Sequence, residues 1–470
     1  MQISSQTSKR LIIACVGIGT FIASLNSSLI TTILPVIRQT LKISLGQSDW
    51  LVLIFLLIMT VSLIPFGKLS DLLGHRLIFL TGFALFTCAA FICGCSANFI
   101  SLFIGRALMG FGSAMILSVG PAILTTTFPS EQRGKVLGLQ ALMAYAGLSF
   151  GPLIGGSITQ LFGWKFAFFI NLPFGLAGLL LGIFVMPKEF VKDTKSFDVR
   201  GMIFFAIAMT SGTLLLNSSS IASNRNIVLP LLFVLLIFAF WQFMIAEHKA
   251  SAPMIKLSLF QIRDFGFGSL GAASNYLIFY LILFAIPNYL EAILHSPSIQ
   301  TGVLITITPL VMVVCSPIVG SLSDRFGSRI FSMMGMFFST LSLVLFAIMT
   351  LTTALPAFIL LISGLICTGL GIGIFAAPNN SAIMGATSQI YQGVASGVVA
   401  TFRNIGMIAG TTLGGTLFDL IYGQISRNGA SSHRNFLSAF SMVMWIAVIF
   451  GILGFICSSY MSKKELLNHK

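Results

Sequence analysis

Long runs of apolar residues, separated by short polar segments, fill almost the whole chain. A bilayer core of about 30 Å needs about 20 apolar residues in helical conformation to cross it. By this measure the sequence predicts fourteen membrane-spanning helices joined by short loops. Their approximate centres are Thr20, Met59, Ala89, Met115, Gly147, Leu176, Met209, Phe238, Phe279, Thr308, Thr340, Ile366, Met407 and Ile449.

The composition points to the same class of protein. Of the 470 residues, 56% are apolar and only 8% are charged, and the mean hydropathy is +0.99. Soluble domains carry about 25% charged residues, so we expect an all-α membrane protein surrounded by a lipid bilayer. The net charge of +14 is spread over short loops, which argues against a nucleic acid partner. The seven cysteines show no metal-ligand spacing, and we expect neither a metal site nor a cofactor.

The distribution of positive charge predicts the orientation of the chain. An even number of spans places both termini on one side, and most Lys and Arg residues fall on that side. Positive loops face the cytoplasm, so we expect a multi-pass protein of the cell (inner or plasma) membrane with both termini cytoplasmic. Lys9 and Arg10 precede an apolar run that continues to about Ile33 without a cleavage site, so this run is interpreted as a span and not as a signal peptide.

The sequence contains an internal repeat of glycines and charges at a nearly constant offset. It predicts three parts: an N-terminal six-helix half (1–198), two inserted linker spans (199–246) and a C-terminal six-helix half (247–470). The first copy of the repeat holds Gly67, Asp71, Gly74, Arg76, Gly105, Gly110, Gly112, Gly147, Gly151, Gly155 and Gly156. The second copy holds Gly320, Asp324, Gly327, Arg329, Gly364, Gly369, Gly371, Gly406, Gly410, Gly414 and Gly415.

Several motifs resemble those of one transporter family. The loop Gly67-Lys-Leu-Ser-Asp-Leu-Leu-Gly-His-Arg76 resembles the signature G-x-L-x-D-R-x-G-R-R/K of the major facilitator superfamily. Leu102–Gly112 and Gly147–Gly156 are similar to the fourth-helix motif and the fifth-helix antiporter motif of its 14-span drug:H+ antiporter branch. Trp164–Pro173 is similar to a connector of that branch. The resemblance implies a major facilitator fold and a secondary transporter that works by alternating access between two parallel halves.

The duplicated loops are candidate gates. Asp71 and Asp324 are expected at the cytoplasmic starts of the following helices, where a carboxylate complements the positive helix end and can pair with Arg76 or Arg329. Ordinary helix caps are the alternative interpretation, but duplication favours a latch between helices. The first copy departs from the family pattern, because Leu72 stands in place of Arg and His75 in place of Arg or Lys. The four loop glycines, Gly67, Gly74, Gly320 and Gly327, allow tight turns.

The fifth span carries a candidate helix-bend motif. Gly147, Gly151 and Gly155 are spaced by four residues and form a bare ridge along which another helix can approach closely. Gly156 extends the motif, and Pro152 removes one helical hydrogen bond. Simple packing would explain the glycines, whereas the resemblance to antiporters implies a bend that seals the cavity against leak.

Two other classes of protein fit the sequence poorly. Gly147-Leu-Ser149-Phe-Gly151 matches the esterase pattern G-x-S-x-G, but Ser149 is expected in the middle of a helix with no histidine at that depth. The sequence has no G-x-x-x-x-G-K-[ST] loop, which excludes an ATP-driven pump of that type. We therefore expect no enzyme activity. A non-transporting receptor or scaffold should lack the twin loops.

The usual proton carrier of a transporter is an acid buried in a span, and none is expected deep in a span here. Drug antiporters of this branch carry an acid in the first helix, where this chain has Asn26, which cannot titrate. Asp49 and Glu291, near span ends, are the nearest alternative carriers. Arg106 and Arg403 lie inside spans and are predicted to serve a cavity, with a satisfied packing role as the alternative.

We expect a monomeric exporter of drugs or other small molecules, and the resemblance to the antiporter branch implies that proton antiport drives it. The alternative is an exporter or facilitator of a dedicated metabolite, including an anion such as a siderophore or lipid precursor, with weak or no proton coupling. A central cavity for the substrate is predicted from scattered polar and aromatic side chains on the central spans. Its expected lining is Asn26, Met59, Arg106, Gln140, Tyr145, Asn275, Tyr276, Tyr280 and Arg403.

Overall fold

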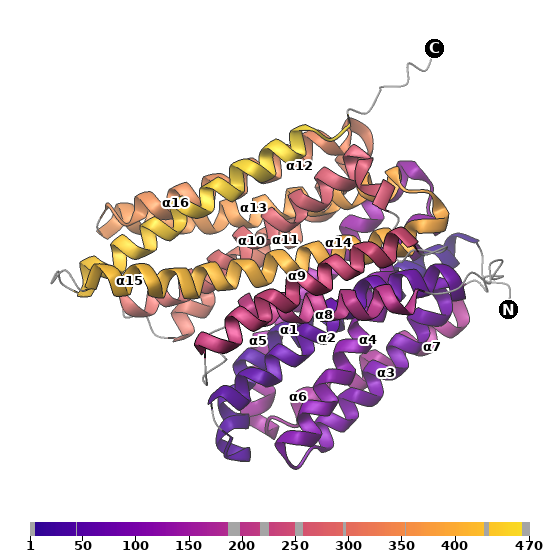
Figure 1. Ribbon diagram of the computed structural model, residues 1–470, viewed down its shortest axis with the longest axis horizontal. Coiled ribbons are helices and arrows are strands. Elements are labelled where there is room, and N and C mark those ends of the chain that lie inside the picture. The colour runs from indigo at the N-terminus through magenta and orange to yellow at the C-terminus, as the bar shows by residue number, and fades with distance from the viewer. Residues whose placement is uncertain are drawn as a thin grey trace. The chain divides into compact units, whose positions relative to one another are not determined.

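A computed structural model of the chain is helical in every element that it describes (Figure 1). Helices satisfy their own backbone hydrogen bonds, which a segment surrounded by lipid requires. The described residues are 5–43, 45–186, 198–216, 225–249, 257–294, 298–352, 354–426 and 432–462. The sequence therefore builds the all-α class that its apolar runs predict.

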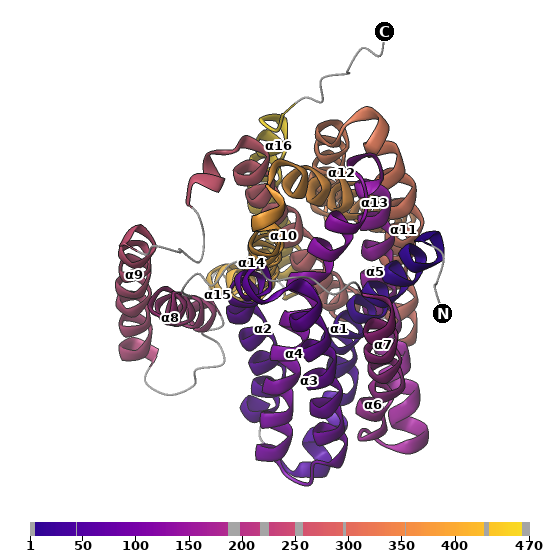
Figure 2. The same cartoon turned by 90° about the vertical axis from the view of Figure 1, so that its right-hand side faces the viewer.

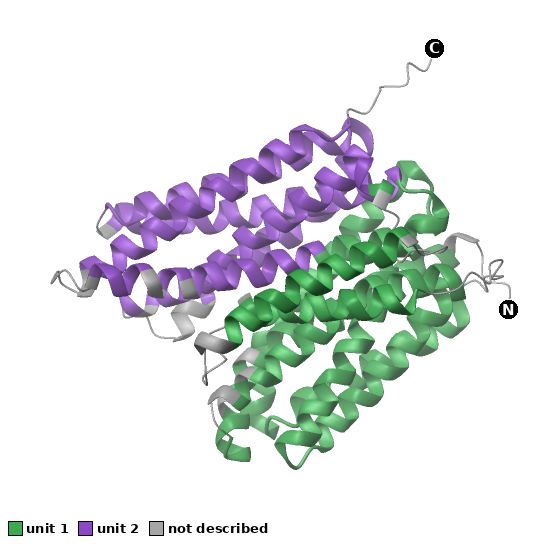
Figure 3. Cartoon of the chain, in the orientation of Figure 1, with its two compact units in different colours: residues 1–259, 387–401 green, residues 260–386, 402–470 purple. Residues whose placement is uncertain are grey.

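The chain forms two compact units, which are coloured separately in Figure 3. Unit 1 comprises Met1–Leu259 and Thr387–Thr401, and unit 2 comprises Phe260–Ala386 and Phe402–Lys470. These units reflect spatial contacts and include the linker helices in unit 1. The division of the sequence at 198 and 246 into two homologous halves and a linker stays a prediction.

Among the described residues, unit 1 holds nine α-helices, several short 3-10 turns and the beginning of a helix that continues into unit 2. Its helices are α1 (Ser5–Leu41), α2 (Leu45–Leu73), α3 (His75–Cys95), α4 (Phe99–Thr127), η1 (Ser130–Gln132), α5 (Arg133–Phe162), α6 (Phe166–Phe169), α7 (Asn171–Val185), α8 (Val199–Leu216) and α9 (Arg225–Lys249). Phenylalanine and aliphatic side chains of α1 to α5 and α7 form its buried core, among them Phe55, Phe79, Phe83 and Phe86.

Unit 2 is built from the later helices around a second core. They are α10 (Arg263–Ala292), α11 (Ser298–Phe326), α12 (Ser328–Met349), α13 (Ala354–Ala386), α15 (Phe418–Ser426) and α16 (Ser432–Ser459). The 3-10 turn η3 (Leu257–Gln261) and helix α14 (Gln392–Thr412), which follows turn η4 (Gln389–Tyr391), are each divided between the units. A π-helical turn, η5 (Leu413–Leu417), joins α14 to α15.

Twelve helices among the described residues are long and apolar enough to cross a membrane. They coincide with twelve of the fourteen predicted spans. The other two predicted spans, near Met209 and Met407, are helical as α8 and α14 but do not reach the same standard. The apolar part of α8 is short, Val199–Leu215, and α14 carries Arg403 and Asn404 in its middle. The count of fourteen is therefore not confirmed.

The two linker helices pack on each other at the edge of unit 1, and α8 also packs against α2 (Figure 2). Most of the large apolar side chains of α9 are exposed, including Leu231, Phe233, Val234 and Trp241. A solvent-facing helix would not carry such a surface, whereas a helix in contact with acyl chains needs it.

Glycines allow helix backbones to touch in both units. A Cβ at Gly151 of α5 would stand 2.9 Å from the Leu25 carbonyl oxygen and 3.0 Å from the Leu29 nitrogen of α1. Gly147 and Gly155 meet the α1 backbone in the same way, while Gly156 meets nothing within 4 Å. The predicted ridge thus lies against α1, and α5 remains helical across Pro152.

The second ridge makes an equivalent contact in unit 2. Gly406 and Gly410 of α14 lie against the backbone of α10 at Ala273 and Leu277. Where the first copy has a proline inside a regular helix, the second widens into the π-helical turn η5. The repeat therefore conserves the close approach of two helices and varies how each ridge ends.

We predict that Gly151→Ala lowers the midpoint of thermal unfolding in detergent by several degrees. The added methyl group collides with backbone atoms of α1, which cannot move as a flexible side chain could, and overpacking typically costs about 1–3 kcal/mol. Gly156→Ala is the matched control in the same helix, and it should unfold at or slightly above the temperature of the unmodified protein. Equal midpoints for the two variants would contradict the ridge as a packing determinant.

Candidate functional site

The two duplicated loops fold alike. Gly74 and Gly327 have φ angles of 96° and 91°, a region that residues with a Cβ rarely adopt, and each begins the following helix. Their amides donate to the carbonyls of Ser70 and Ser323, in both cases at 2.9 Å. This similarity shows that the repeat extends from sequence to local conformation.

Asp71 lies in the last turn of α2, not at the start of α3 as the sequence analysis expected. Asp324 likewise lies near the end of α11. The expectation was wrong because the helix continues through the acid and breaks only at the glycine that follows. At the C-terminal end of α2 a carboxylate is unfavourable for the helix dipole, so another partner must stabilise it.

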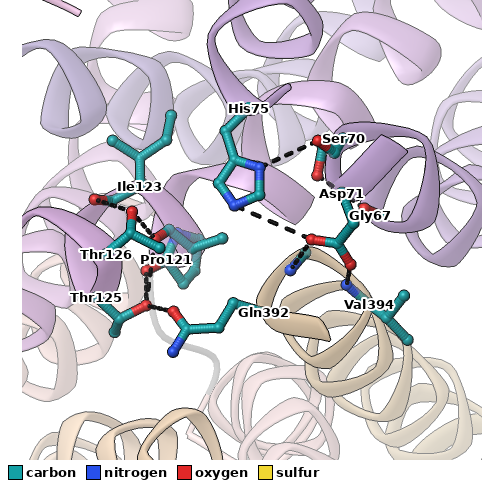
Figure 4. A network of polar contacts seen from close by, with 12 residues as sticks. Gly67, Ser70, Asp71, His75, Pro121, Ile123, Thr125, Thr126, Gln392 and Val394 are labelled. Carbon is teal, nitrogen blue, oxygen red and sulfur yellow. Dashed lines mark hydrogen bonds and ion pairs between the residues drawn. The ribbon is translucent and has the colours of Figure 1, made fainter. Parts of the chain in front are cut away.

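The partner of Asp71 is the first turn of α14. The two oxygens of its carboxylate accept hydrogen bonds from the backbone amides of Gly393 at 2.8 Å and Val394 at 2.9 Å (Figure 4). The side chain is only 5% exposed. Free amides and the positive end of the helix dipole both favour a negative charge at this position. Asp71 is therefore a cap for a helix more than three hundred residues away in the chain.

Glycines make this cap possible. A Cβ at Gly67 would stand 3.0 Å from the carbonyl carbon of Gly393, and a Cβ at Gly393 would collide with Ser70 and Asp71. Gly397, one turn later, comes as close to Leu63 of α2. The beginning of α14 thus lies directly on the end of α2.

Two further residues surround the cap. His75 is 4.0 Å from the Asp71 carboxylate through Nε2, and its Nδ1 is 3.2 Å from the Ser70 carbonyl oxygen. The Gln392 side chain accepts a hydrogen bond from the hydroxyl of Thr125 in α4 (Figure 4). The sequence marked His75 only as a departure from the family pattern and gave no signal for Gln392.

In the first copy the loop arginine has a different partner from the loop acid that the spacing predicted. Arg76 instead donates to the Ile183 carbonyl at 2.8 Å, near the C-terminal end of α7. A cation is favourable there because the last carbonyls of a helix carry partial negative charge. In the second copy Asp324 and Arg329 are half-buried.

Arg106 of α4 is fully buried. Its guanidinium carbon is 4.3 Å from the centre of the Phe55 ring, and its Nε donates to the Leu51 carbonyl at 3.1 Å. Both terminal nitrogens lack a hydrogen-bond partner among the described residues. An Arg held by one carbonyl and one aromatic face has unused donors for an acceptor group.

Asn26 is also fully buried, and it pairs with another amide. Its Nδ2 donates to Oδ1 of Asn171 at 2.6 Å, at the first residue of α7. The Asn171 amide in turn donates to the carbonyls of Ala167 and Phe168. Asn26 therefore joins α1 to α7, and its own oxygen has no partner among the described residues.

The remaining predicted lining residues lie in different surroundings. Gln140 donates to Thr20 at 3.1 Å, and Met59 and Tyr145 are buried. Asn275 is buried and donates to Ser339 of α12 at 2.9 Å. Tyr276, Tyr280 and Arg403 come together: the Arg403 guanidinium carbon is 5.6 Å from the centre of the Tyr276 ring and interacts electrostatically with Tyr280.

Two expectations concern side chains outside the described part of the chain. The positions of the Asp49 and Glu291 side chains, the alternative proton carriers, are not described.

Ser149 lies inside α5, where its hydroxyl donates to the Tyr145 carbonyl of the preceding turn at 2.8 Å. A serine bonded in this way in a continuous helix has none of the features of a nucleophile elbow.

Comparison with known proteins assigns a family and a fold. The model of the Major Facilitator Superfamily matches residues 16–273 and 268–465. The chain is 32% identical to the riboflavin transporter RibZ of Clostridioides difficile (strain 630), over 97% of each chain. It is 27% identical to the multidrug transporter protein MdtP of Bacillus subtilis (strain 168), over 89% of this chain and 77% of the relative. The human organic anion transporter MFSD10 has the same fold, with a TM-score of 0.64 at 17% identity, over 94% of this chain and 99% of that one.

We predict that Asn26→Ala and Asn171→Ala each destabilise the protein, because each leaves a buried amide without its partner, which typically costs about 1–3 kcal/mol. The double variant should lose less stability than the two single losses added together, since it removes both members of the pair. Thermal unfolding of the four proteins in detergent measures this coupling. Asn288→Ala is the control, because Asn288 is exposed and donates to the Phe284 carbonyl of its own helix. Additive losses would contradict a direct amide pair.

Proposed function

The chain belongs to the major facilitator superfamily, and we propose that it exports drugs or other small molecules by alternating access, with proton antiport as the driving reaction. Its resemblance to drug-efflux relatives over most of the chain supports this proposal. We propose the 14-span arrangement for it, with both termini on the cytoplasmic side of the cell membrane, and a monomer as the working unit.

The observation that carries the proposal is the contact between Asp71 and α14. Alternating access needs contacts that form in one state and break in another. A carboxylate bound to two main-chain amides is strong while it is charged and in place, yet it involves few atoms and can be broken as a unit. We propose that this cap is a latch, and that Asp324 serves the second copy of the loop in the same role.

A second candidate function has its own support. The similarity to a riboflavin transporter extends over 97% of both chains, which favours a dedicated metabolite as the substrate. Asn26 cannot carry a proton, which supports transport without coupling through the first helix. The buried cation Arg106 favours neutral or anionic molecules over organic cations. Riboflavin is the concrete compound to test.

Proteoliposomes that contain the full chain test the two functions together. Uptake and release of riboflavin, ethidium and an organic anion are followed with and without an imposed pH gradient. We expect movement of at least one compound, and acceleration by the pH gradient supports proton antiport. A rate of riboflavin transport that is the same with and without the pH gradient supports the second function. If no compound moves faster than in empty vesicles, both proposals fail.

We predict that Asp71→Asn lowers the transport rate at least about fivefold while expression and membrane insertion stay near normal, since the variant loses the charge that binds the helix end. Asp71→Ser keeps a capping oxygen without the charge and should be equally slow. Glu131→Gln removes an exposed acid on the same side of the predicted topology and serves as the control. A rate for Asp71→Asn within the error of the unmodified protein would refute the latch.

A further inference from the structure

We propose that Arg403, Tyr276 and Tyr280 form a binding subsite for a flat aromatic ligand with hydrogen-bond acceptors along one edge. This inference rests on the proposed function, because the ligand of the subsite would be the transported molecule. It adds the chemical class of that molecule and the side chains of unit 2 that recognise it.

The three side chains come from two neighbouring helices. Tyr276 and Tyr280 are one helical turn apart and share a face of α10. Arg403 reaches over them from α14, with its guanidinium carbon 5.6 Å from the centre of the Tyr276 ring. Tyr280 lies close enough to both of the other residues to be within range of their charges. The cluster thus offers aromatic faces and a planar cation in one place.

The backbone holds this arrangement in position. Gly406 lies less than one turn after Arg403 and contacts the Ala273 backbone, and Gly410 contacts Leu277 in the next turn. No side chain separates the helices at these points, so α10 and α14 cannot shift without losing the contact. A guanidinium and two rings on such a rigid pair are organised before a ligand arrives.

Arg403 has unused capacity for hydrogen bonding. Its Nε is buried and has no acceptor among the described residues, and within that part of the chain it forms no ion pair. The Arg403 and Tyr280 side chains are both half-buried, which leaves part of each surface for contact. Tyr276 is buried, and its ring supports the Arg403 guanidinium. A buried N–H without an acceptor favours binding of a group that supplies one.

These features select a ligand class. Tyrosine rings stack on flat aromatic molecules, and a guanidinium binds carbonyl or carboxylate oxygens with two parallel donors. A fixed positive charge disfavours cations of the same shape. Ala144 occupies the matching position of the first repeat, so the internal symmetry does not require an arginine at 403. The ring system of riboflavin, with carbonyl oxygens on one edge, belongs to the selected class.

Riboflavin binding to the purified full chain in detergent tests the subsite, because stacking on tyrosine quenches flavin fluorescence. We expect Arg403→Gln to weaken binding about tenfold or more, because it removes the charge and the paired donors. Arg403→Lys should recover only part of this loss, since it restores the charge without the planar fork. Tyr280→Leu should reduce the quenching at saturation, whereas Tyr280→Phe should preserve it.

Arg434→Gln is the matched control, because Arg434 is an exposed arginine of the same unit. An affinity of Arg403→Gln within twofold of the Arg434→Gln value overturns the subsite, even if riboflavin is transported. Elution from size exclusion as a single folded species is required of each variant, and the comparison of Tyr280→Leu with Tyr280→Phe decides the matter if Arg403→Gln does not fold.

A competition series separates this inference from the proposed function. Flat aromatic carboxylates and uncharged flavins should displace riboflavin more effectively than ethidium does. If the protein binds another flat acceptor-bearing ring with the same pattern of variants but does not transport riboflavin, the subsite holds and riboflavin is not the substrate. Preference for ethidium, or failure to bind any flat aromatic compound, overturns the subsite.

Discussion

Direct contact between helix backbones is the constraint on which the rest of this structure depends. In lipid, apolar side chains gain little by leaving their surroundings for one another, so helices associate where small residues let their backbones meet. The chain uses the same contacts twice. A Cβ added at Gly110 would stand 2.8 Å from the Phe55 carbonyl oxygen. A Cβ added at Gly369 would stand 2.7 Å from the Thr308 carbonyl oxygen. Phe55 and Thr308 occupy matching places in the repeat.

Two contacts that we propose to serve transport lie beside such points. Asp71 reaches the amides of α14 because Gly67 and Gly393 let the two helices touch. Arg403 lies over Tyr276 one turn from the contact of Gly406 with α10. Close packing therefore does more than hold the helices together, because it fixes the positions of charged groups relative to the amides and aromatic rings that they contact.

The sequence predicted most of what depends on local pattern. Apolar length located the spans, and the four-residue spacing of Gly147, Gly151 and Gly155 identified the face that lies on α1. The count of fourteen spans was less secure, because α8 is short and α14 carries polar residues. Prediction from hydropathy considers each segment by itself. A helix that contacts other helices on several sides tolerates polar residues, which lower its hydropathy.

Partners distant in the chain were beyond such reasoning. Asp71 was expected to serve its own loop, but its acceptor oxygens are used by amides that belong to α14. The pair of Asn26 with Asn171 was likewise invisible, because nothing in either local sequence shows that α1 and α7 meet at those residues. The spacing of residues along one helix shows which of them share a face. Which residues of other helices contact that face is known only from the folded structure.

The cap on α14 has a consequence for how this protein can evolve. Asp71 recognises main-chain amides, which every residue except proline supplies, so the contact does not depend on the chemical identity of the Val394 side chain, which is constrained by its own burial. Gly393 is restricted by the contact itself, because Gly67, Ser70 and Asp71 occupy the space of a side chain. Contacts between side chains can be recognised from substitutions that occur in pairs among relatives. The contact between Asp71 and the backbone amide of Val394 would not produce such paired substitutions.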